Sequence, residues 1–261
     1  MPTSHLGRRL ESKTAVVTGG SRGIGFAIAR VLAVEGCRVI ITGRDADRLE
    51  QSKAELNHTA ATSRPVTEVI GDVGNSEALV AAISCDVRNP QSVDALFAEV
   101  RHCFGRLDIL VNNAGIAQPP LPIEETSLRM WANQLDTNLT GTFLCTRAAL
   151  PLMKPGATII NNISAAAKQT FPNFAAYTAA KAGALGFTLS LRNELMPRGI
   201  RVTALMPGAT STDLWNQIMP DARRDRMIDP DSVAQAVLYA VLLPPEANLS
   251  ELLLSPTGGA V

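Results

Sequence analysis

A glycine-rich turn from Thr18 to Gly25 is the feature that most constrains how this chain can fold. Residues 13–18 before the turn are typical of a buried strand, and residues 24–35 after it carry apolar side chains at helical spacing. A strand, a glycine turn and a helix in this order form the context that a dinucleotide-phosphate site requires. Three glycines would permit the tight turn, let the backbone approach a pyrophosphate and allow close packing of helix on strand: Gly19, Gly23 and Gly25.

Strand and helix signals alternate along almost the whole chain. We predict strands at 13–18, 37–42, 82–86, 107–111, 157–163, 200–206 and 250–254, and helices at 24–35, 45–57, 90–103, 126–153, 174–196 and 231–243. Such alternation predicts an α/β fold, a Rossmann-type doubly wound parallel sheet of about seven strands with helices on both faces, in three layers. A hydrophobic content of 46% suits a sheet buried on both faces, and we expect residues 1–261 to form a single domain.

One stretch departs from this alternation. Between Arg44 and Asp86 the chain has more residues than one helix and one strand need, and two similar pieces occur there, at 71–75 and 85–89. We take the second piece, with Asp86 and Val87, as the functional one, because the next helix and strand follow it at normal distances. Residues 60–80 are then expected to be an insertion at the edge of the sheet.

Charge and cysteine content exclude several classes of partner. The chain has 24 basic and 24 acidic residues, so neither a nucleic acid nor an anionic membrane surface has electrostatic support. No segment reaches ~18 continuous apolar residues, and the N-terminus lacks a signal-type apolar core, so we expect a cytoplasmic protein. The four cysteines form no Cys-x-x-Cys pair, so we expect buried thiols and no metal site: Cys37, Cys85, Cys103 and Cys145.

Tyr177 and Lys181 stand one helical turn apart on a predicted helix. Positions i and i+4 share a helix face, so the ammonium of Lys181 could favour the ionised form of the Tyr177 phenol. A phenol pKa of ~10 would then lie closer to working pH. Such a pair is common on solvated helices, but together with the glycine turn it indicates a redox enzyme.

The chain resembles the short-chain dehydrogenase/reductase family over nearly its whole length. Seven matching elements occur in the family's order: the turn at 18–25, Asn112-Asn113-Ala114-Gly115, Asn138, Ser164, the pair Tyr177 and Lys181, Pro207-Gly208, and Thr212. The resemblance implies an enzyme that acts on CH–OH groups and interconverts a carbonyl group of a small molecule and a secondary alcohol.

The resemblance also implies catalytic roles for four residues. Tyr177 would be the general acid/base, and Ser164 would donate a hydrogen bond to the substrate oxygen. Lys181 would hold the nicotinamide ribose and assist ionisation of the phenol, and Asn138 would hold a water that links Lys181 to solvent. Considered alone, Ser164 could be an ordinary strand-end serine and Asn138 an ordinary structural asparagine.

A nicotinamide cofactor is implied at the carboxyl ends of the strands. Its expected contacts are Gly19, Ser21, Arg22, Gly23, Ile24, Arg44, Asp86, Val87, Asn113, Ala114, Gly115, Tyr177, Lys181, Pro207, Gly208, Thr210 and Thr212. The asparagines at 112 and 113 are also expected to tie neighbouring strands together.

The end of the second strand favours NADP(H) over NAD(H). Gly43 stands where an acidic residue would bond the free 2′-hydroxyl of NAD, and Arg44 follows it. Arg22 adds a second guanidinium, and two such groups suit a 2′-phosphate. Asp45 could instead fold back onto the ribose or cap the next helix.

The sequence leaves the substrate open. The chain ends in Pro256-Thr257-Gly258-Gly259 rather than the Asp-Gly-Gly of many 3-oxoacyl-(acyl-carrier-protein) reductases, which nevertheless remain an alternative function. Residues 210–228 are expected to form a substrate lid of mixed polarity, with no strong preference for a charged substrate. An alternative of another class is a catalytically silent NADP-binding regulator, against which the four intact catalytic positions argue.

Two long apolar helices, at 126–153 and 174–196, predict self-association. Small residues on the second helix would let another helix approach closely: Ala179, Ala182, Gly183 and Gly186. We therefore expect a homodimer or homotetramer, although the same apolar residues could simply fill a thick core.

Overall fold

The computed structural model describes residues 8–63 and 79–258. Over these residues seven strands form one parallel sheet in the order β3-β2-β1-β4-β5-β6-β7. The strands are β1 (Thr14–Thr18), β2 (Arg38–Gly43), β3 (Val80–Ser84), β4 (Leu107–Asn112), β5 (Met153–Asn162), β6 (Arg201–Pro207) and β7 (Glu251–Leu254). The order reverses between β1 and β4, which is where ligands bind in such sheets. The predicted doubly wound fold is confirmed.

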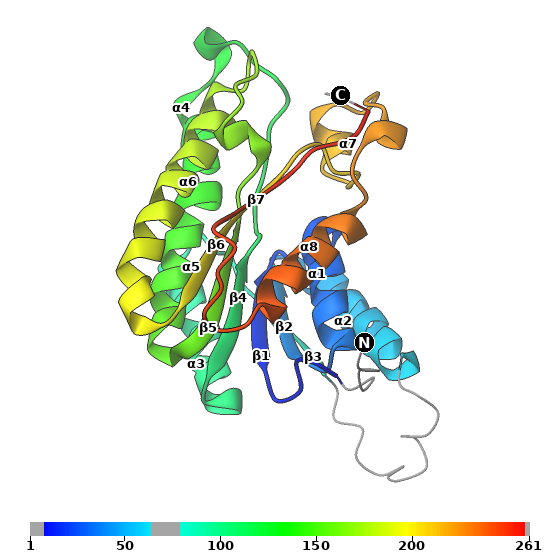
Figure 1. Ribbon diagram of the computed structural model, residues 1–261. Coiled ribbons are helices and arrows are strands. Elements are labelled where there is room, and N and C mark those ends of the chain that lie inside the picture. The colour runs from blue at the N-terminus through cyan, green and yellow to red at the C-terminus, as the bar shows by residue number, and fades with distance from the viewer. Residues whose placement is uncertain (1–7, 64–78, 259–261) are drawn as a thin grey trace.

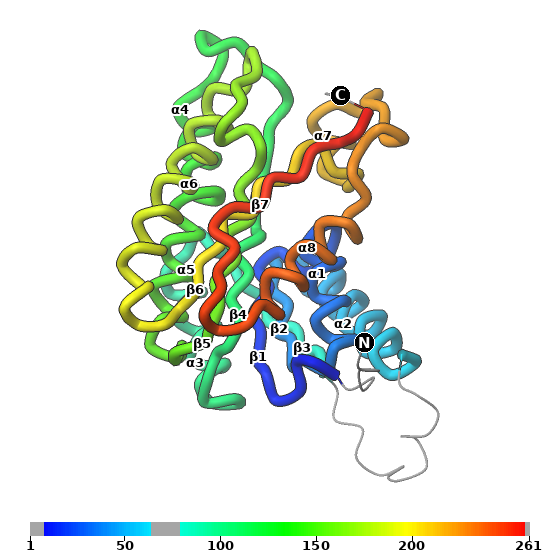
Figure 2. Tube along the Cα trace, in the orientation of Figure 1, coloured from blue at the N-terminus to red at the C-terminus, as the bar shows by residue number. Residues whose placement is uncertain are grey.

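Helices cover both faces of the sheet (Figure 1). One face carries α1 (Gly23–Val34), α2 (Ala46–Thr62) and α8 (Pro230–Leu242), and the other carries α3 (Pro90–Phe104), α4 (Leu128–Leu135), α5 (Gly141–Ala149) and α6 (Ala175–Leu195). The short helix α7 (Trp215–Ile218) lies in the connection between β6 and α8. Figure 2 shows the chain after β7 running towards the segment that carries α7.

Alternate residues of the central strands fill two separate cores. Val17 and Ile41 pack in the cluster beneath α1, α2 and α8. Val16 and Ile40 pack in the cluster on the other face, with apolar residues of α3, α5 and α6. This period of two is the expected pattern for strands buried on both sides.

The helix predicted over 126–153 is not continuous. A π-helical turn, η3 (Asp136–Thr140), separates α4 from α5, and β5 begins at Met153. The turn lies where the Asn138 amide is anchored to the backbone of Ile116, away from the helix's own hydrogen-bond ladder. Pro151 lacks a backbone donor, so α5 ends at Ala149 and only a 3-10 turn (Leu150–Leu152) precedes β5.

The third strand also differs from its prediction. β3 begins at Val80 rather than residue 82, because the side chain of Asn57 pairs with both the N–H and the C=O of Val80 and fixes the start of the strand. Helix α2 extends through Thr62, so the first residues of the predicted insertion at 60–80 are helical. Residues 64–78 of that insertion lie outside the described residues.

The C-terminal end of α8 is capped by the side chain of a neighbouring strand residue, Arg201 of β6. Its guanidinium donates to the carbonyl oxygens of Leu243 (2.9 Å), Val241 (2.9 Å), Ala240 (3.4 Å) and Ala247 (3.4 Å). The last turn of α8 has no basic residue of its own to serve these carbonyls. The cap therefore joins α8 to the sheet.

Three of the four cysteines are buried, as expected, but Cys103 is exposed on α3. Its Sγ atom lies 3.0 Å from a carboxylate oxygen of Glu99, one turn earlier on the outer face of the helix. In the described part of the chain, no helix is long and apolar enough to span a membrane.

Candidate active site

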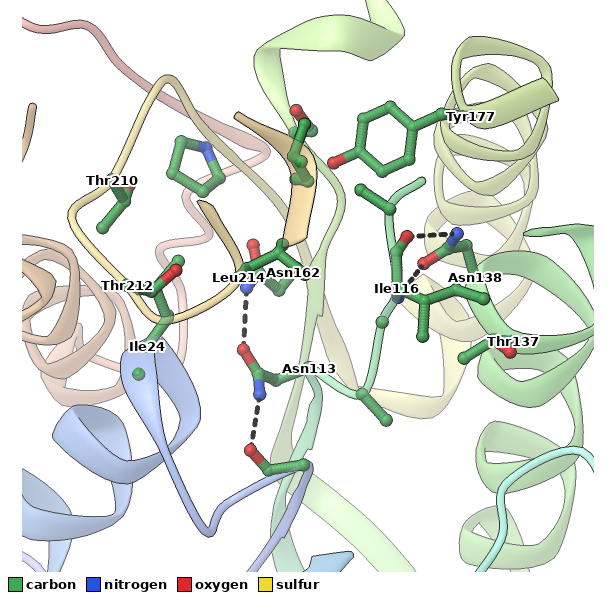
Figure 3. Close-up of a pocket in the computed structure, with 18 of the residues that line it drawn as sticks. Ile24, Asn113, Ile116, Thr137, Asn138, Asn162, Tyr177, Thr210, Thr212 and Leu214 are labelled. Atoms are coloured by element: carbon green, nitrogen blue, oxygen red, sulfur yellow. Dashed lines mark hydrogen bonds between the residues drawn. The ribbon is translucent and has the colours of Figure 1, made fainter. Parts of the chain in front are cut away.

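The carboxyl ends of the strands open into a cavity of ≈ 790 Å³. Every residue that the sequence analysis assigned to the cofactor or to catalysis lines this cavity. These residues come from the loops after β1 to β6 and from η3 and α6, so the fold brings together positions almost 200 residues apart. In Figure 3 the loop with Thr210, Thr212 and Leu214 faces Tyr177 and Asn138 across the cavity.

The glycine turn has no room for side chains at the positions expected to face phosphates. Gly19 has φ +63°, and a Cβ there would lie 2.9 Å from the Cα of Ala114. Gly23 has φ +54°, and its Cβ would meet the Thr212 side chain at 3.1 Å. At Gly25 a Cβ would lie 2.3 Å from the carbonyl oxygen of Gly19, which explains the close packing of helix and turn.

The amide of Asn113 ties three strand ends together at this edge. Its Nδ2 donates to the carbonyl oxygens of Thr18 (2.9 Å) and Gly19 (3.1 Å), and its Oδ1 accepts from Nδ2 of Asn162 at 2.8 Å (Figure 3). Asn112 points to the other side, where its Nδ2 donates to Asn161 at 2.8 Å. Both asparagines thus have the strand-tying role expected for them.

Asn138 is held rigidly inside the π-helical turn. Its Oδ1 accepts from the N–H of Ile116 at 3.0 Å and its Nδ2 donates to the C=O of Ile116 at 2.9 Å (Figure 3). A Cβ on Gly115 would lie 2.9 Å from Oδ1 of Asn138 and 3.5 Å from Nζ of Lys181. The glycine therefore allows the asparagine and the lysine to lie close together.

Tyr177 and Lys181 project from the same face of α6 into the cavity. The Lys181 ammonium is buried, lies 5.7 Å from the centroid of the Tyr177 ring and donates to the C=O of Asn162 at 3.4 Å. Burial lowers the pKa of Lys181 to about 8. Figure 3 shows the Tyr177 hydroxyl pointing into the cavity.

The pKa of Tyr177 moves opposite to the direction expected from Lys181. Burial raises it above its ordinary value, and hydrogen bonding with Ser164 acts in the lowering direction. Burial dominates because the phenolate would lose its hydration inside the cavity. The phenol therefore keeps its proton at neutral pH.

The end of the cavity nearest β2 is rich in guanidinium groups. Arg22 and Arg44 both line it, and the guanidinium of neither forms a hydrogen bond or ion pair with another described residue. Asp45 accepts from the N–H of Arg48 at 3.1 Å, so of its two expected roles the structure shows the helix cap. Asp86 pairs with Arg88 at 2.6 Å, and this arginine holds the pKa of Asp86 below its ordinary value.

Among the polar residues of the cavity that sequence reasoning missed are Arg48 and Asn162. Arg48 donates to the C=O of Ser21 at 3.4 Å and pairs with Asp213 at 3.1 Å, so it links the glycine turn to the loop after β6. The only indication of Arg48 in the sequence is its position four residues after Arg44, which follows the second strand. Asn162 has a buried Oδ1 with no hydrogen-bond partner among the described residues, and only its place two residues before Ser164 could have indicated it.

Comparison with known proteins gives matches along nearly the whole chain. The family described as enoyl-(acyl carrier protein) reductase matches residues 19–247. A 3-oxoacyl-(acyl-carrier-protein) reductase of Synechocystis is 35% identical over 262 residues, which cover 97% of this chain and 98% of that protein.

Solved structures agree with the fold. A short-chain dehydrogenase of Burkholderia cenocepacia in complex with NADP is 32% identical, with a TM-score of 0.80, and the match covers 96% of this chain and 98% of that one. A 3-ketoacyl-(acyl-carrier-protein) reductase of Brucella melitensis complexed with NADH is 28% identical, also with a TM-score of 0.80, over 95% of this chain and 98% of that one.

Proposed function

The chain belongs to the short-chain dehydrogenase/reductase family, and from this premise we propose that it is an NADP(H)-dependent oxidoreductase that interconverts a carbonyl group and a secondary alcohol. The observation that carries the proposal is the meeting of Ser164, Tyr177 and Lys181 in the cavity that the glycine turn also lines. One wall of the cavity carries a proton donor, Tyr177, and a cation, Lys181, and the other wall is formed by the glycine backbone of the turn after β1.

The residues present fit a dinucleotide. The cradle at Gly19 and Gly23 would be filled by a Cβ at either position, and the N-terminus of α1 has no side-chain cap of its own. The carboxyamide of a nicotinamide could donate to the orphaned buried Oδ1 of Asn162. The guanidinium groups of Arg22 and Arg44 have no hydrogen-bond partner in residues 8–63 and 79–258, and they favour a 2′-phosphate, hence NADP(H) over NAD(H).

The chain's own groups perform the proton chemistry. When bound, the nicotinamide supplies a hydride for reduction or accepts one in oxidation. Tyr177, protonated at neutral pH, donates its proton to the substrate carbonyl oxygen and, in the reverse direction, takes it back from the alcohol. Ser164 donates a hydrogen bond to the same oxygen as charge develops there.

Lys181 and Asn138 support this donor. The buried ammonium of Lys181 is placed to hold ribose hydroxyls and to favour the phenolate once the proton has left. Asn138 widens the helix at η3, which leaves backbone carbonyls there for a water that leads from Lys181 to solvent. Residues 210–228 form the lid over this site, within one domain that spans the chain.

Reduction of a 3-oxoacyl group on acyl carrier protein is the second candidate, and the name of the Synechocystis relative favours it. A catalytically silent regulator is the third. The proton donor Tyr177 and its neighbours Ser164 and Lys181 are all present, which favours an enzyme over a regulator.

The test is Tyr177→Phe, followed by NADPH oxidation at 340 nm over a panel of ketones. Loss of the donor should cut kcat at least ~10²-fold, while the dissociation constant for NADPH stays within about threefold, because the ring remains. The matched control is Tyr239→Phe, on α8, where the side chain is 63% exposed. Near-parental turnover by purified Tyr177→Phe would refute the assignment of the donor.

A further inference from the structure

The two ends of the cavity differ in charge, and from this we propose the substrate class. We infer that the substrate is an uncharged ketone, or its alcohol, with a bulky apolar group such as an aryl ring beside the carbonyl carbon. The inference rests on the proposed function, since it assumes that the oxygen of the substrate lies at Tyr177.

Two polar side chains of the lid are paired with other residues of the chain, and one of them, Asp213, also lines the cavity. Asp213 pairs with Arg48 at 3.1 Å, and Asn216 accepts from Arg224 at 2.6 Å. Gln217 is exposed and is not among the residues that line the cavity. Mixed polarity in the sequence thus becomes an amphipathic segment in the structure.

The other side of the same segment carries apolar side chains that line the cavity. Four apolar residues recur at helical spacing and line the cavity: Leu214, Trp215, Ile218 and Met219. The indole N–H of Trp215 donates to the C=O of Thr210 at 2.9 Å, so its only donor is already used. What this wall offers a substrate is a ring face and alkyl groups.

The opposite wall is also apolar around the proton donor. The ring of Phe174 meets the ring of Tyr177 edge to face, with centroids 6.3 Å apart. Phe171, Ile116 and Ala117 also line the cavity, and Phe171 remains 43% exposed. Among the described residues, the one uncharged amide that lines it after Ser164 is that of Gln169. Aromatic rings in this arrangement favour a flat apolar group next to the reacting carbonyl.

Apart from Lys181 and Asp213, which is paired with Arg48, the charged side chains that line the cavity lie elsewhere. These charged residues follow β1, β2 and β3, at the end of the cavity that is assigned to the adenosine half of the cofactor. They are Arg22, Arg44, Arg48, Asp86 and Arg88. Among the described residues that line the end between Tyr177 and α7, no side chain is a free cation. A carboxylate or phosphate on the substrate would be buried there without a partner, which is costly.

The experiment compares acetophenone with 4-acetylbenzoate, which differs from it by one carboxylate, and with acetoacetyl-coenzyme A. NADPH oxidation gives kcat/KM for each. We expect acetophenone to exceed 4-acetylbenzoate by on the order of 10²-fold, because a hydrophobic wall rejects an unpaired charge more strongly than a change of size. Equal rates for the two, or a preference for acetoacetyl-coenzyme A, would overturn the substrate class and leave the oxidoreductase function intact.

A matched pair of variants tests the wall itself. Met219→Lys adds a cation at a rim position that is already 37% exposed, and it should lower the ratio of acetophenone to 4-acetylbenzoate about tenfold. Gln217→Lys adds the same charge on the outward side of the segment and should leave the ratio unchanged. An equal effect of both variants would show that general charge, rather than the wall, sets selectivity.

Binding separates failure of the inference from failure of the proposed function. Calorimetry on the Tyr177→Phe variant with NADP⁺ present, where the alcohol is bound but not oxidised, should show 1-phenylethanol binding more tightly than 4-(1-hydroxyethyl)benzoate. If this selectivity holds but no ketone is reduced by the parent protein, the proposed function is wrong, while the preference of the site for an uncharged apolar ligand is supported. If the carboxylate binds as tightly as the neutral alcohol, the inference fails whatever the activity.

Discussion

Lys181 carries its charge inside the cavity with only 5% of its surface exposed, and the consequence is a pKa of about 8. The shift from the ordinary value of 10.5 corresponds to about 3 kcal/mol by which burial disfavours the charged form. A functional group that is costly to bury is the usual mark of a site selected for chemistry over stability.

Lys181→Met should therefore stabilise the protein while abolishing activity. Below pH 8 the lysine is charged in both the folded and the unfolded chain. The variant's gain in free energy of unfolding is therefore fully present there and amounts to at most about 3 kcal/mol. Between pH 8 and 10.5 the folded chain loses the proton before the unfolded chain does, so parental stability rises and the gain shrinks. Thermal unfolding of both proteins at pH 7 and pH 10 measures this difference, and a less stable Met variant at pH 7 would contradict it.

Cofactor choice is a second prediction at the scale of single residues. A Cβ on Gly43 would have only ordinary contacts, at 3.4 Å from Ser21 Oγ and 3.6 Å from Leu49, so an aspartate fits there. The double change of Gly43→Asp and Arg44→Ser should lower the ratio of kcat/KM for NADPH to that for NADH by ~10²-fold, through one lost ion pair and new repulsion.

Gly43→Ala is the matched control, because it adds volume without charge. The ratio should then stay close to that of the parent. A parent that already prefers NADH would show that the free guanidinium groups of Arg22 and Arg44 do not decide the cofactor.

The sequence could indicate residues whose role depends on their own type and spacing. The pair Tyr177 and Lys181 belongs to this group, because one helix fixes their separation. Arg48 does not, because its role comes from Asp213, which the chain reaches only after six strands have assembled. Nor could the sequence show that burial would outweigh the lysine in setting the pKa of Tyr177.

At the scale of elements, periodic patterns predicted where helices lie better than where they break. The apolar pattern over 126–153 continues through η3, because the π-helical turn results from a bond to Ile116, twenty-two residues earlier than Asn138. The start of β3 was misplaced for the same reason, since Asn57 on α2 fixes it. Both errors come from side chains that pair with a distant backbone.

The cap on α8 predicts a large effect of one distant side chain on stability. Arg201→Met would leave the carbonyls of the last turn without donors, at a cost of about 2–4 kcal/mol. The melting temperature should fall by roughly 5–10 °C, given the size of the chain. Activity at 25 °C should remain, because Arg201 lies at the opposite end of β6 from the cavity.

Arg101→Met, on the exposed side of α3, is the control for that measurement. A surface change of this kind should alter stability by no more than about 0.5 kcal/mol. Equal melting temperatures for the two variants would show that α8 does not depend on its cap.

At the scale of the whole molecule, the exposed side of α5 and α6 supports self-association. Phe143 is 42% exposed and meets Phe187 edge to face, and nothing lies within 4 Å of the place of a Cβ on Gly186. Gly183 differs from expectation, because a Cβ there would lie 3.0 Å from Leu139 of the same chain. Of the four small residues that the sequence analysis named on this helix, Ala182 and Gly186 remain exposed for a second subunit.

Gly186→Glu should convert an oligomer to smaller species and lower activity, because α6 also carries Tyr177 and Lys181. Glutamate is a better helix former than glycine, so the fold of the subunit should persist. Ala98→Glu, on the exposed side of α3, is the matched control. Light scattering coupled to size-exclusion chromatography measures the masses, and a parent protein that is monomeric at micromolar concentration would refute the interface.

The hydrogen bonds of Asn113 restrict the relative motion of the strand ends beneath the site. They make the glycine turn and the end of β5 a single rigid floor beneath the site. The loop after β6 is tied to α2 through Arg48 and Asp213, whose side chains are 41% and 57% exposed, and such contacts open at far lower free energy than bonds in the core. We expect the loop after β6 to open by the parting of that ion pair, while the three strand ends keep their alignment.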